Sequence, residues 1–290
     1  MIKIIAMKDS FILNVRGKTI ELGRRTAVMG ILNVTPDSFS NGGRYWEHNK
    51  AFERGIQMIE EGADIIDIGG ESTRPGSNTV SIQEEIDRIM PIVENIVKKV
   101  IVSVDTYKAD VAEIALKSGV HIINDISAMR FDSRMVEVVR KYNVPIILMH
   151  IKGTPKDMQK DPEYDDLLEE IKEYFEERID FAIYNGIKLE NIIIDPGIGF
   201  GKQIKDNFLL LKRLSDLKIF GCPILIGPSR KSFIGSILNL PSDERIEGTA
   251  AAVTAGILNG ANIVRVHDVK EMVRVVKIAD EILYSDINIM

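Results

Sequence analysis

The sequence is poor in the residues that support cysteine chemistry and membrane insertion. It contains one cysteine and one tryptophan among 290 residues. A single cysteine, Cys222, excludes an intrachain disulfide and a zinc site built from several thiolates, and it fits a reducing cytosol. Its place directly before Pro223 favours a small buried apolar side chain over a nucleophile. No apolar run approaches the roughly 20 residues that cross a bilayer.

An excess of positive charge is also missing. The chain carries 37 Lys and Arg against 43 Asp and Glu, for a formal net charge of -6. A broad basic surface for nucleic acid is therefore not expected, and any bound anion must be met by local groups. The first ten residues, "MIKIIAMKDS", lack the apolar core of a signal peptide. We expect a soluble, cytoplasmic protein with neither nucleic-acid nor membrane partners.

The chain does contain enough apolar residues, 45%, for one large core. Short apolar runs rich in β-branched residues recur at 27–34, 64–70, 101–105, 122–126, 145–150, 191–197, 223–229 and 263–268. Most are continuous rather than alternating, which is typical of parallel strands covered on both faces. Helical patterns separate them, as at 51–62, 84–99, 108–119, 165–186 and 271–285.

Strand and helix alternate eight times, which predicts an α/β protein with a (β/α)8 TIM barrel as one domain over residues 1–290. The segment "SFILNVRGKTIEL" before the first strand predicts a β-hairpin within an N-terminal extension, residues 1–26. We expect it to turn near Arg16-Gly17-Lys18 and to close the barrel floor. Active sites of such barrels lie at the carboxyl ends of the strands.

Polar residues stand at all eight of these strand ends. They are Asn33; Glu71 with Thr73 and Arg74; Asp105; Asn124 and Asp125; His150; Asp195; Ser229 to Ser232; and Arg265 with His267. Each needs a hydrogen-bond partner or a ligand to offset its desolvation. A single aspartate in such a place commonly caps the next helix, and this alternative stays open for Asp105 and Asp125. The full set favours a polar pocket.

The pocket has two chemical characters. Arg74, Lys231, Arg265 and His267 are donors suited to phosphate oxygens. Asp105, Asn124 and Asp195 suit a flat heterocycle with several N–H groups. The pocket could therefore bind a ligand that has a polar ring and an anionic tail.

Two motifs allow more than one interpretation. The segment "DPGIGFGK" contains GxGxG without the full GxGxxG or P-loop spacing, so it is a weak nucleotide signature. Its glycines more simply let the backbone close around a ligand beside Asp195. His150 is either a ligand contact or a core histidine that bonds to a carbonyl group.

The motifs together resemble the dihydropteroate synthase family. In the family's order the chain contains "GILNVTPDSFSNGG", "GADIIDIGGESTRPG", "VSVDTYKADVAEIALKSG", "INDIS", "LMHIKGTPKDMQ", "IIDPGIGFGK", "IGPSRKSFIG", "EGTAAAV" and "VRVHDV". They span residues 27–270, and the family uses a (β/α)8 barrel.

The resemblance implies condensation of 6-hydroxymethyl-7,8-dihydropterin diphosphate with 4-aminobenzoate, with Mg2+, to 7,8-dihydropteroate and pyrophosphate in folate synthesis. By motif position it assigns Asp105, Asn124, Met149, Asp195 and Lys231 to the pterin, and Asn33, Thr73, Arg74, Arg265 and His267 to the diphosphate. Catalysis falls to Asp105, Lys231, Asn33, Arg74, Arg265 and His267, and Asn33 is also the metal ligand. The aminobenzoate site comprises Phe39, Pro75, Phe200 and Ser232.

Closure of the site is a further expectation. An electron-poor pterin methylene reacts with water unless it is covered, so movable loops are needed. The loop "TPDSFSNGGRYW", with Asp37, Ser40, Gly42 and Gly43, is expected to form one lid, and "STRPGSNT" another. By analogy with the family we also expect a homodimer, through an apolar helix near residues 248–260 or 271–285.

Departures and rival functions remain. Ile151 and Lys152 stand where the family often has Met and Gln, and the segment after Lys202 lacks the family's frequent Thr and His. A methyltransferase barrel that uses methyltetrahydrofolate would share the Asp, Asn and Asp pterin contacts but would not need "TPDSFSNGG" or "SRKS". A catalytically silent scaffold would have no reason to keep so many costly polar groups at one rim.

Overall fold

The computed structural model describes residues 10–35, 44–73 and 76–285, and of residues 44–47 the backbone alone. Eight parallel strands form one sheet, in the order β8-β7-β6-β5-β4-β3-β10-β9. An isolated parallel bridge between Ile194 and Ile224 joins the two edges and closes the barrel. The strands are β3 (Ala27–Asn33), β4 (Ile65–Gly69), β5 (Ile101–Asp105), β6 (Ile122–Asp125), β7 (Ile146–Met149), β8 (Ile192–Asp195), β9 (Leu225–Ile226) and β10 (Ile263–Val266).

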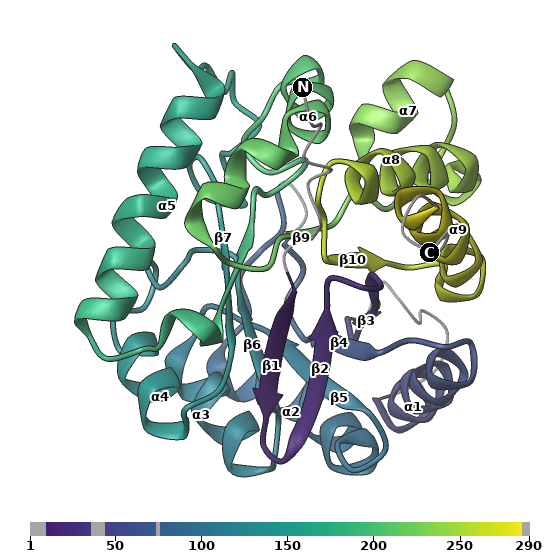
Figure 1. The fold of residues 1–290 in the computed structure, drawn as a ribbon. Helices are drawn as coiled ribbons and strands as arrows, with labels where there is room; N and C mark the ends of the chain where they lie inside the picture. Colours follow the sequence, from purple (N-terminus) through teal and green to yellow (C-terminus); the bar gives the residue numbers. More distant parts are fainter. Residues whose placement is uncertain (1–9, 36–43, 74–75, 286–290) are drawn as a thin grey trace.

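Helices surround this barrel, as Figure 1 shows. In the described residues they are α1 (Arg44–Glu60), α2 (Ile82–Ile96), α3 (Ala109–Lys117), α4 (Met135–Tyr142), α5 (Leu167–Tyr184), α6 (Ile204–Lys212), α7 (Ser232–Leu238), α8 (Ile246–Leu258) and α9 (Val269–Tyr284), with 3-10 turns η2 (Leu189–Asn191), η3 (Leu214–Phe220) and η4 (Ser242–Glu244). The predicted TIM barrel is confirmed.

Three local expectations were wrong. The connection from β9 to β10 holds two helices, α7 and α8, rather than one. Strand β9 has two residues instead of the predicted run 223–229, because Gly227, Pro228 and Ser229 turn away from the sheet, and Pro228 has no N–H for a ladder. Helix α1 begins at Arg44, within the segment predicted to be a loop through residue 46.

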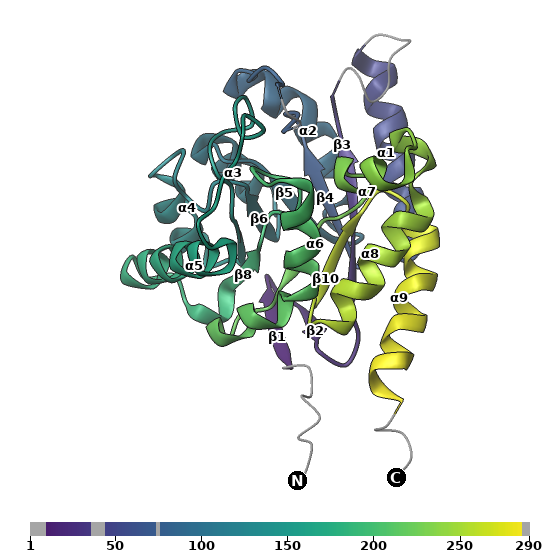
Figure 2. The ribbon, with the colours of Figure 1, turned by 90° about the horizontal axis from the view of Figure 1, so that it is seen from above.

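The N-terminal hairpin closes one end of the barrel, as predicted. It consists of β1 (Phe11–Val15) and β2 (Lys18–Leu22), which pair antiparallel with Val15 opposite Lys18. Arg16 and Gly17 both have positive φ, 49° and 82°, as a two-residue hairpin turn of type I′ requires. Leu13, Val15, Ile20 and Leu22 point into the barrel interior, where they contact the first inward side chain of each strand. Figure 2 shows the hairpin at the end of the barrel away from α7.

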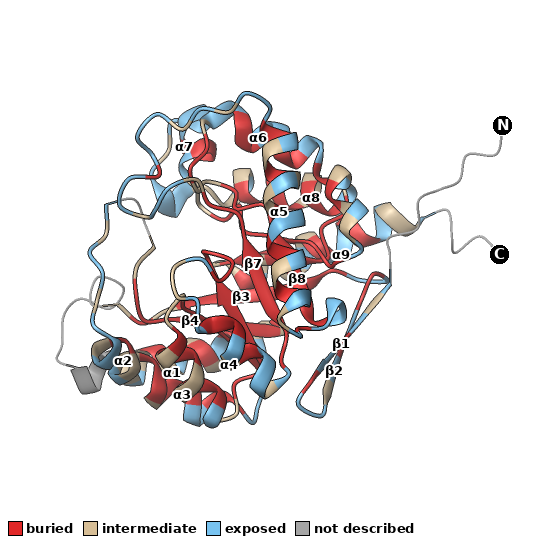
Figure 3. Ribbon diagram, turned by 90° about the vertical axis from the view of Figure 1, so that its left-hand side faces the viewer, coloured by how far each residue is buried: buried red, intermediate tan, exposed pale blue. Residues whose placement is uncertain are grey.

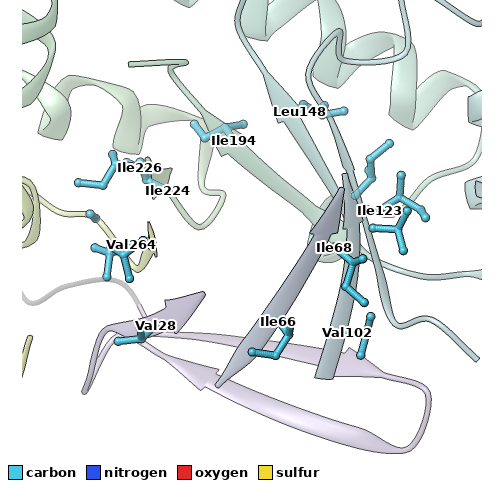
Figure 4. Close-up of a cluster of buried hydrophobic side chains, with 14 of the residues drawn as sticks. Val28, Ile66, Ile68, Val102, Ile123, Leu148, Ile194, Ile224, Ile226 and Val264 are labelled. Carbon is cyan, nitrogen blue, oxygen red and sulfur yellow. The ribbon is translucent and has the colours of Figure 1, made fainter. Parts of the chain in front are cut away.

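The main core lies between the strands and the helices. Alternate strand residues that face outward, among them Val28, Ile66, Val102, Ile194 and Val264, belong to one buried apolar cluster with the helices. Figure 4 draws side chains of this cluster around the strands and labels ten of them, and Figure 3 shows the strands as the buried centre of the molecule. Because both faces of the sheet are covered, the strands read as continuous apolar runs.

Two further expectations, on membrane spans and on Cys222, can be compared with the described residues. Among residues 10–35, 44–73 and 76–285, no helix is long and apolar enough to cross a membrane. Cys222 is buried, 2% exposed, and burial raises its pKa to about 12, so the prediction of an unreactive core side chain is confirmed.

Candidate active site

The inward side chains change from apolar to polar within two residues along the same strands. Side chains of a strand alternate between its faces, so every second residue points inward. The first inward residues pack against the hairpin, and the next ones face the open end of the barrel. The inward series are Ile65, Asp67 and Gly69 on β4; Ile101, Ser103 and Asp105 on β5; and Ile263, Arg265 and His267 in and just after β10. We call the open end the mouth and the hairpin end the floor.

Strand register brings the predicted residues to similar heights in the mouth. Asp105 stands opposite Asn124, and Met149 stands opposite Asp195. Asn33 stands opposite Gly69, which in turn stands opposite Asp105. Side chains far apart in sequence therefore converge at one rim.

Arg265 is the electrostatic centre of the mouth. Its Nε donates to Asp67 Oδ2 at 2.6 Å and its Nη2 to Asp105 Oδ2 at 2.8 Å. Asn124 Nδ2 also donates to Asp67 Oδ2, at 3.0 Å. Asp67 is fully buried, Asp105 side-chain exposure is 9% and that of Arg265 is 18%. The Arg265 guanidinium therefore holds two buried carboxylates in place.

Burial raises the pKa of Asp105 to about 7, with the Arg265 guanidinium opposing the shift and the charge of Asp67 adding to it. Burial also raises the pKa of Asp195, against the opposing charge of Lys231. Buried carboxylates with raised pKa values and specific charge partners are typical of functional sites.

Asp67 is a residue that the sequence analysis missed. It lies in the middle of the run "DIIDIGG", at an inward position, where a carboxylate needs a specific partner. Its Oδ1 and the Ser103 Oγ beside it in register are buried and have no hydrogen-bond partner among the described residues. The signal was available, because a charged residue inside a continuous apolar strand is as costly as one at its end.

Lys231 and Asp195 lie on the side of the mouth that follows β8 and β9. Asp195 Oδ1 accepts a hydrogen bond from the Gly197 N–H at 2.8 Å. Lys231 Nζ donates to the Ile198 carbonyl and lies 4.4 Å from the centre of the Phe200 ring. Burial lowers the pKa of Lys231 to about 7, and the charge of Asp195 opposes this shift. Lys231 is therefore held against the turn after β8 by Ile198 and Phe200.

The backbone before Lys231 explains its direction. Arg230 has φ of 59°, in the left-handed region that is costly for a side-chain-bearing residue. Its N–H donates to Thr249 Oγ1 at 3.1 Å, its carbonyl accepts from Arg245 Nη1 at 2.9 Å, and its Nε donates to Asp268 Oδ2 at 2.9 Å. These contacts hold a reversal of the chain, so that Arg230 points to the helices and Lys231 points to the mouth.

His267 and Thr73 lie at the rim. Ser229 Oγ is 3.0 Å from His267 Nδ1 and accepts from the His267 N–H at 3.2 Å.

Thr73 is half-buried in the loop after β4. That loop is anchored by Glu71, which accepts from the Lys108 ammonium at 2.6 Å and from Tyr107 Oη at 2.7 Å. A cavity of about 320 Å3 lies beside this anchor, lined in part by Glu71, Tyr107, Phe131 and Pro155.

The helix-capping alternative is wrong for both Asp105 and Asp125, since α4 begins only at Met135, after Arg134 and without a side-chain cap. Helix α3 is preceded by Lys108, without a side-chain cap, and Asp105 bonds to Arg265 instead. Asp125 accepts from the N–H groups of Ser127 and Met129 at 2.8 Å each, so it stabilises the turn after β6. The core interpretation of His150 is also supported, because the side chain is buried and lies 2.8 Å from Lys202 Nζ.

The remaining predicted residues divide into two groups. Phe200 is half-buried next to Lys231, whereas Ser232 begins α7 and is exposed. Lying outside the described residues are Asp37, Phe39, Ser40, Gly42, Gly43, Arg74 and Pro75.

Comparison with known proteins identifies the family. A family model described as pterin binding enzyme matches residues 29–267. Dihydropteroate synthase from Synechocystis sp. is 47% identical over 268 residues, which cover 91% of this chain and 93% of that protein. A Yersinia pestis dihydropteroate synthase structure with a sulfonamide drug complex has TM-score 0.89 and 44% identity, covering 95% of this chain and 100% of that one. A Clostridium difficile dihydropteroate synthase structure with pteroic acid has TM-score 0.85 and 45% identity, covering 90% and 98%. The chain therefore belongs to the pterin-binding enzyme family and, within it, to the dihydropteroate synthases.

Proposed function

We propose that this chain condenses 6-hydroxymethyl-7,8-dihydropterin diphosphate with 4-aminobenzoate, joining the pterin methylene carbon to the amine and releasing pyrophosphate. The observation that carries the proposal is the convergence of Asp105, Asn124 and Asp195 with Lys231 at the mouth of the barrel. The resemblance in sequence and the likeness to a structure with pteroic acid support the same reaction.

The pterin ring is proposed to lie against the polar strand ends. Its N–H groups would donate to Asp105 and Asp195, and Asn124 offers an amide at the height of Asp105. Asp67 Oδ1 and Ser103 Oγ, which have no hydrogen-bond partner in the described part of the chain, lie deeper in the interior and can be satisfied through water. Met149, 3% exposed, offers an apolar surface to the ring face.

The diphosphate is proposed to contact the rim on the side of β3, β4 and β10. Asn33 ends β3, and Thr73 and Arg74 come after β4 in the sequence. Arg265 lies in β10, and His267 comes just after it. Two donors of Arg265 are already bonded to Asp67 and Asp105, so its remaining N–H groups and its charge would serve the diphosphate. Arg265 would therefore both bind the diphosphate and orient Asp105.

Mg2+ is proposed to accompany the diphosphate. This ion commonly takes few protein oxygens and keeps substrate phosphates and waters as its other ligands. The amide oxygen of Asn33, half-buried at the mouth, fits that donor type. When bound, the ion would neutralise charge on the departing pyrophosphate.

The chemistry is an alkyl transfer in which a C–N bond forms and a C–O bond breaks. The aminobenzoate nitrogen attacks the pterin methylene, pyrophosphate leaves with the bonding electron pair, and the nitrogen loses one proton to solvent. The Asp105 carboxylate offsets positive charge that develops in the ring, while the cationic rim stabilises the leaving group. Phe200 and Ser232, with Phe39 and Pro75, are proposed to hold the aminobenzoate.

Three more expectations are kept as proposals. Exposed apolar side chains on α6, α7 and α9, including Phe208, Ile237 and Ile278, are compatible with a homodimer. The cytoplasm remains the proposed compartment. The loops around Asp37 to Gly43 and around Arg74 are proposed to cover the reacting atoms.

Pyrophosphate release with and without 4-aminobenzoate tests the reaction. We expect release to depend on both substrates and on Mg2+. Asp105→Asn and Lys231→Ala should each lower kcat/KM by about 100-fold or more while the protein stays folded. Near-normal rates in both variants would reject the site. Transfer of a methyl group from methyltetrahydrofolate to a corrinoid protein, without pyrophosphate chemistry, would favour the methyltransferase alternative.

A further inference from the structure

A buried lysine and a buried histidine lie beneath the turn that follows β8, which comprises residues 196–201. Lys202 is 3% exposed and His150 is 4% exposed. Lys202 Nζ lies 2.8 Å from His150 Nδ1, 3.0 Å from the Phe200 carbonyl oxygen and 3.5 Å from the His150 carbonyl oxygen. The described contacts of this ammonium are thus an imidazole and two carbonyls, and no carboxylate among the described residues touches it directly.

The protonation states follow from the burial of both groups. Burial lowers the pKa of His150 well below its ordinary value, and the Lys202 charge lowers it further. Burial also lowers the pKa of Lys202, to about 7, while the nearby charge of Asp195 opposes that shift. His150 is therefore neutral and accepts at Nδ1, and Lys202 carries its proton below about pH 7.

The turn packs closely against His150, the residue whose imidazole contacts Lys202. Gly197 has φ of 68°, and a Cβ on it would lie 2.0 Å from the His150 carbonyl oxygen. The His150 N–H donates to the Asp195 carbonyl at 2.9 Å, and the Gly197 N–H donates to Asp195 Oδ1 at 2.8 Å. The position of the Asp195 carboxylate thus depends on the contact between this turn and the end of β7.

Lys231 contacts the same turn from the mouth side. It bonds to the Ile198 carbonyl and lies over the Phe200 ring, and a Cβ on Gly199 would lie 2.7 Å from its Cδ. Lys202 bonds to the Phe200 carbonyl from beneath. The turn therefore separates two lysines, one facing the ligand and one buried.

We propose that Lys202, held by neutral His150, is a positioning residue that fixes the turn 196–201 and keeps Asp195 ionised for pterin binding. This inference rests on the proposed function, in which Asp195 accepts hydrogen bonds from the pterin. Lys202 itself does not contact substrate. It acts through Asp195, Phe200 and Lys231.

The charges around Asp195 come from several elements. Burial raises its pKa, and the groups that lower it are Lys231 before α7, the Gly197 N–H, Arg265 on β10 and Lys202. Lys202 is in turn faced by Asp195, Lys231 and Asp206, and His150 by Lys202, Arg130 and Lys152. Removal of the Lys202 charge therefore raises the pKa of Asp195 further, so that pterin binding is lost at a higher pH.

Lys202→Met tests this role because Met preserves the unbranched stem and removes the charge. We expect the KM for the pterin diphosphate to rise about tenfold, kcat to change by less than about threefold, and the acid limb of kcat/KM to move up by about one pH unit. Lys172→Met is the matched control, since Lys172 pairs with exposed Glu169 on α5 and is not among the charges that face Asp195, Lys202 or His150. An unmoved acid limb and an unchanged KM in Lys202→Met, with only a loss of stability, would overturn the inference.

Two variants of His150 cover the case in which Lys202→Met does not fold. His150→Gln keeps an acceptor for the ammonium, whereas His150→Leu removes it. We expect His150→Leu to move the acid limb at least twice as far as His150→Gln. Equal acid limbs in the two variants would contradict the proposal.

Asp195→Asn separates this inference from the proposed function. If Asp195→Asn binds the pterin substrate as tightly as the unmodified protein, the proposed pterin site is wrong and the inference falls with it. If Asp195→Asn loses binding but Lys202→Met keeps both its affinity and its acid limb, the pterin site stands and only the role of Lys202 is rejected.

Discussion

At the floor of the barrel the inward side chains are Ile65, Ile101 and Ile263, and two residues further along the same strands they are Asp67, Ser103 and Arg265. The floor is packed against the hairpin and needs no ligand to satisfy it. The mouth holds carboxylates, an arginine and orphaned polar atoms that a ligand or water must satisfy. The difference shows that one strand can supply stability at one end and a costly reactive site at the other.

Arg265→Met tests the mouth and should have the largest effect, on both stability and turnover. Without the guanidinium, Asp67 and Asp105 are left as unpaired buried carboxylates, which costs about 3–5 kcal/mol of unfolding free energy. Turnover should also be lost. Urea denaturation and pyrophosphate release measure the two losses.

Arg25→Met is the control for this change. Arg25 also pairs with an aspartate, Asp64, but its side chain is 58% exposed. An exposed pair contributes about 0–1 kcal/mol. Equal destabilisation by the two variants would show that burial of the Arg265 pairs does not matter.

Ile147→Ala tests whether the floor contributes to stability without affecting the mouth. The side chain is fully buried in the cluster that includes the hairpin, so its truncation should cost about 2–5 kcal/mol. The kcat and KM of the folded fraction should stay unchanged, because no mouth residue moves. Ile12→Ala, at a hairpin side chain that is 59% exposed, should change stability by less than about 0.5 kcal/mol. A changed KM in Ile147→Ala would contradict the separation of the two ends.

The two ends should also respond to pH in opposite directions. His121 lies near the floor, its Nδ1 accepts from the Val102 N–H at 3.1 Å, and burial lowers its pKa from 6.5 to about 4. The unfolded chain binds this proton first, so stability falls as pH drops from 6.5 to 4, by up to about 1.4 kcal/mol per pH unit. Denaturation of His121→Gln across this range should show a smaller slope.

Asp105 gives the opposite sign at the mouth. Its pKa is raised from 3.8 to about 7, so the folded state binds this proton more tightly than the unfolded chain. Stability should therefore fall as pH rises from about 4 to 7, and Asp105→Asn should remove that decline. The same slope in the variant and the unmodified protein would reject this assignment.

Gly17→Ala should have the smallest effect. Gly17 has φ of 82° with open space around it, so a Cβ adds only backbone strain, about 1–2 kcal/mol. Thr19→Ala, on the exposed side of the hairpin, serves as the control. Thermal unfolding measures the change, and activity should be unaffected in both variants.

Much of this arrangement could be predicted from the sequence, because strand periodicity and barrel topology fix where a strand ends. Asp105, Asn124 and Asp195 were placed at the mouth by that reasoning, and the hairpin turn at Arg16-Gly17 by its residue types. The fold and the family are confirmed. The roles of the individual site residues stay predictions.

Other features depend on contacts across the barrel, which no single segment reveals. The partner of Asp67 is Arg265, which lies nearly 200 positions later in the chain. The reversal at Arg230 depends on Thr249, Arg245 and Asp268, and the role of Lys202 depends on His150. Strand β9 ends where Gly227, Pro228 and Ser229 leave the sheet, and the additional helix α7 begins just after the reversal at Arg230.

A crystal structure with bound pterin diphosphate tests the central claim most directly. The barrel also has a cavity of about 330 Å3 at the floor, lined by Thr19, Ile20, Glu21, Arg25, Asp64 and Ile101. We predict that the ring lies in the mouth, within hydrogen-bond distance of Asp105, Asn124 and Asp195, and that the floor cavity holds no pterin. A pterin bound at the floor, or a mouth in which these three side chains point away from the ring, would contradict the account.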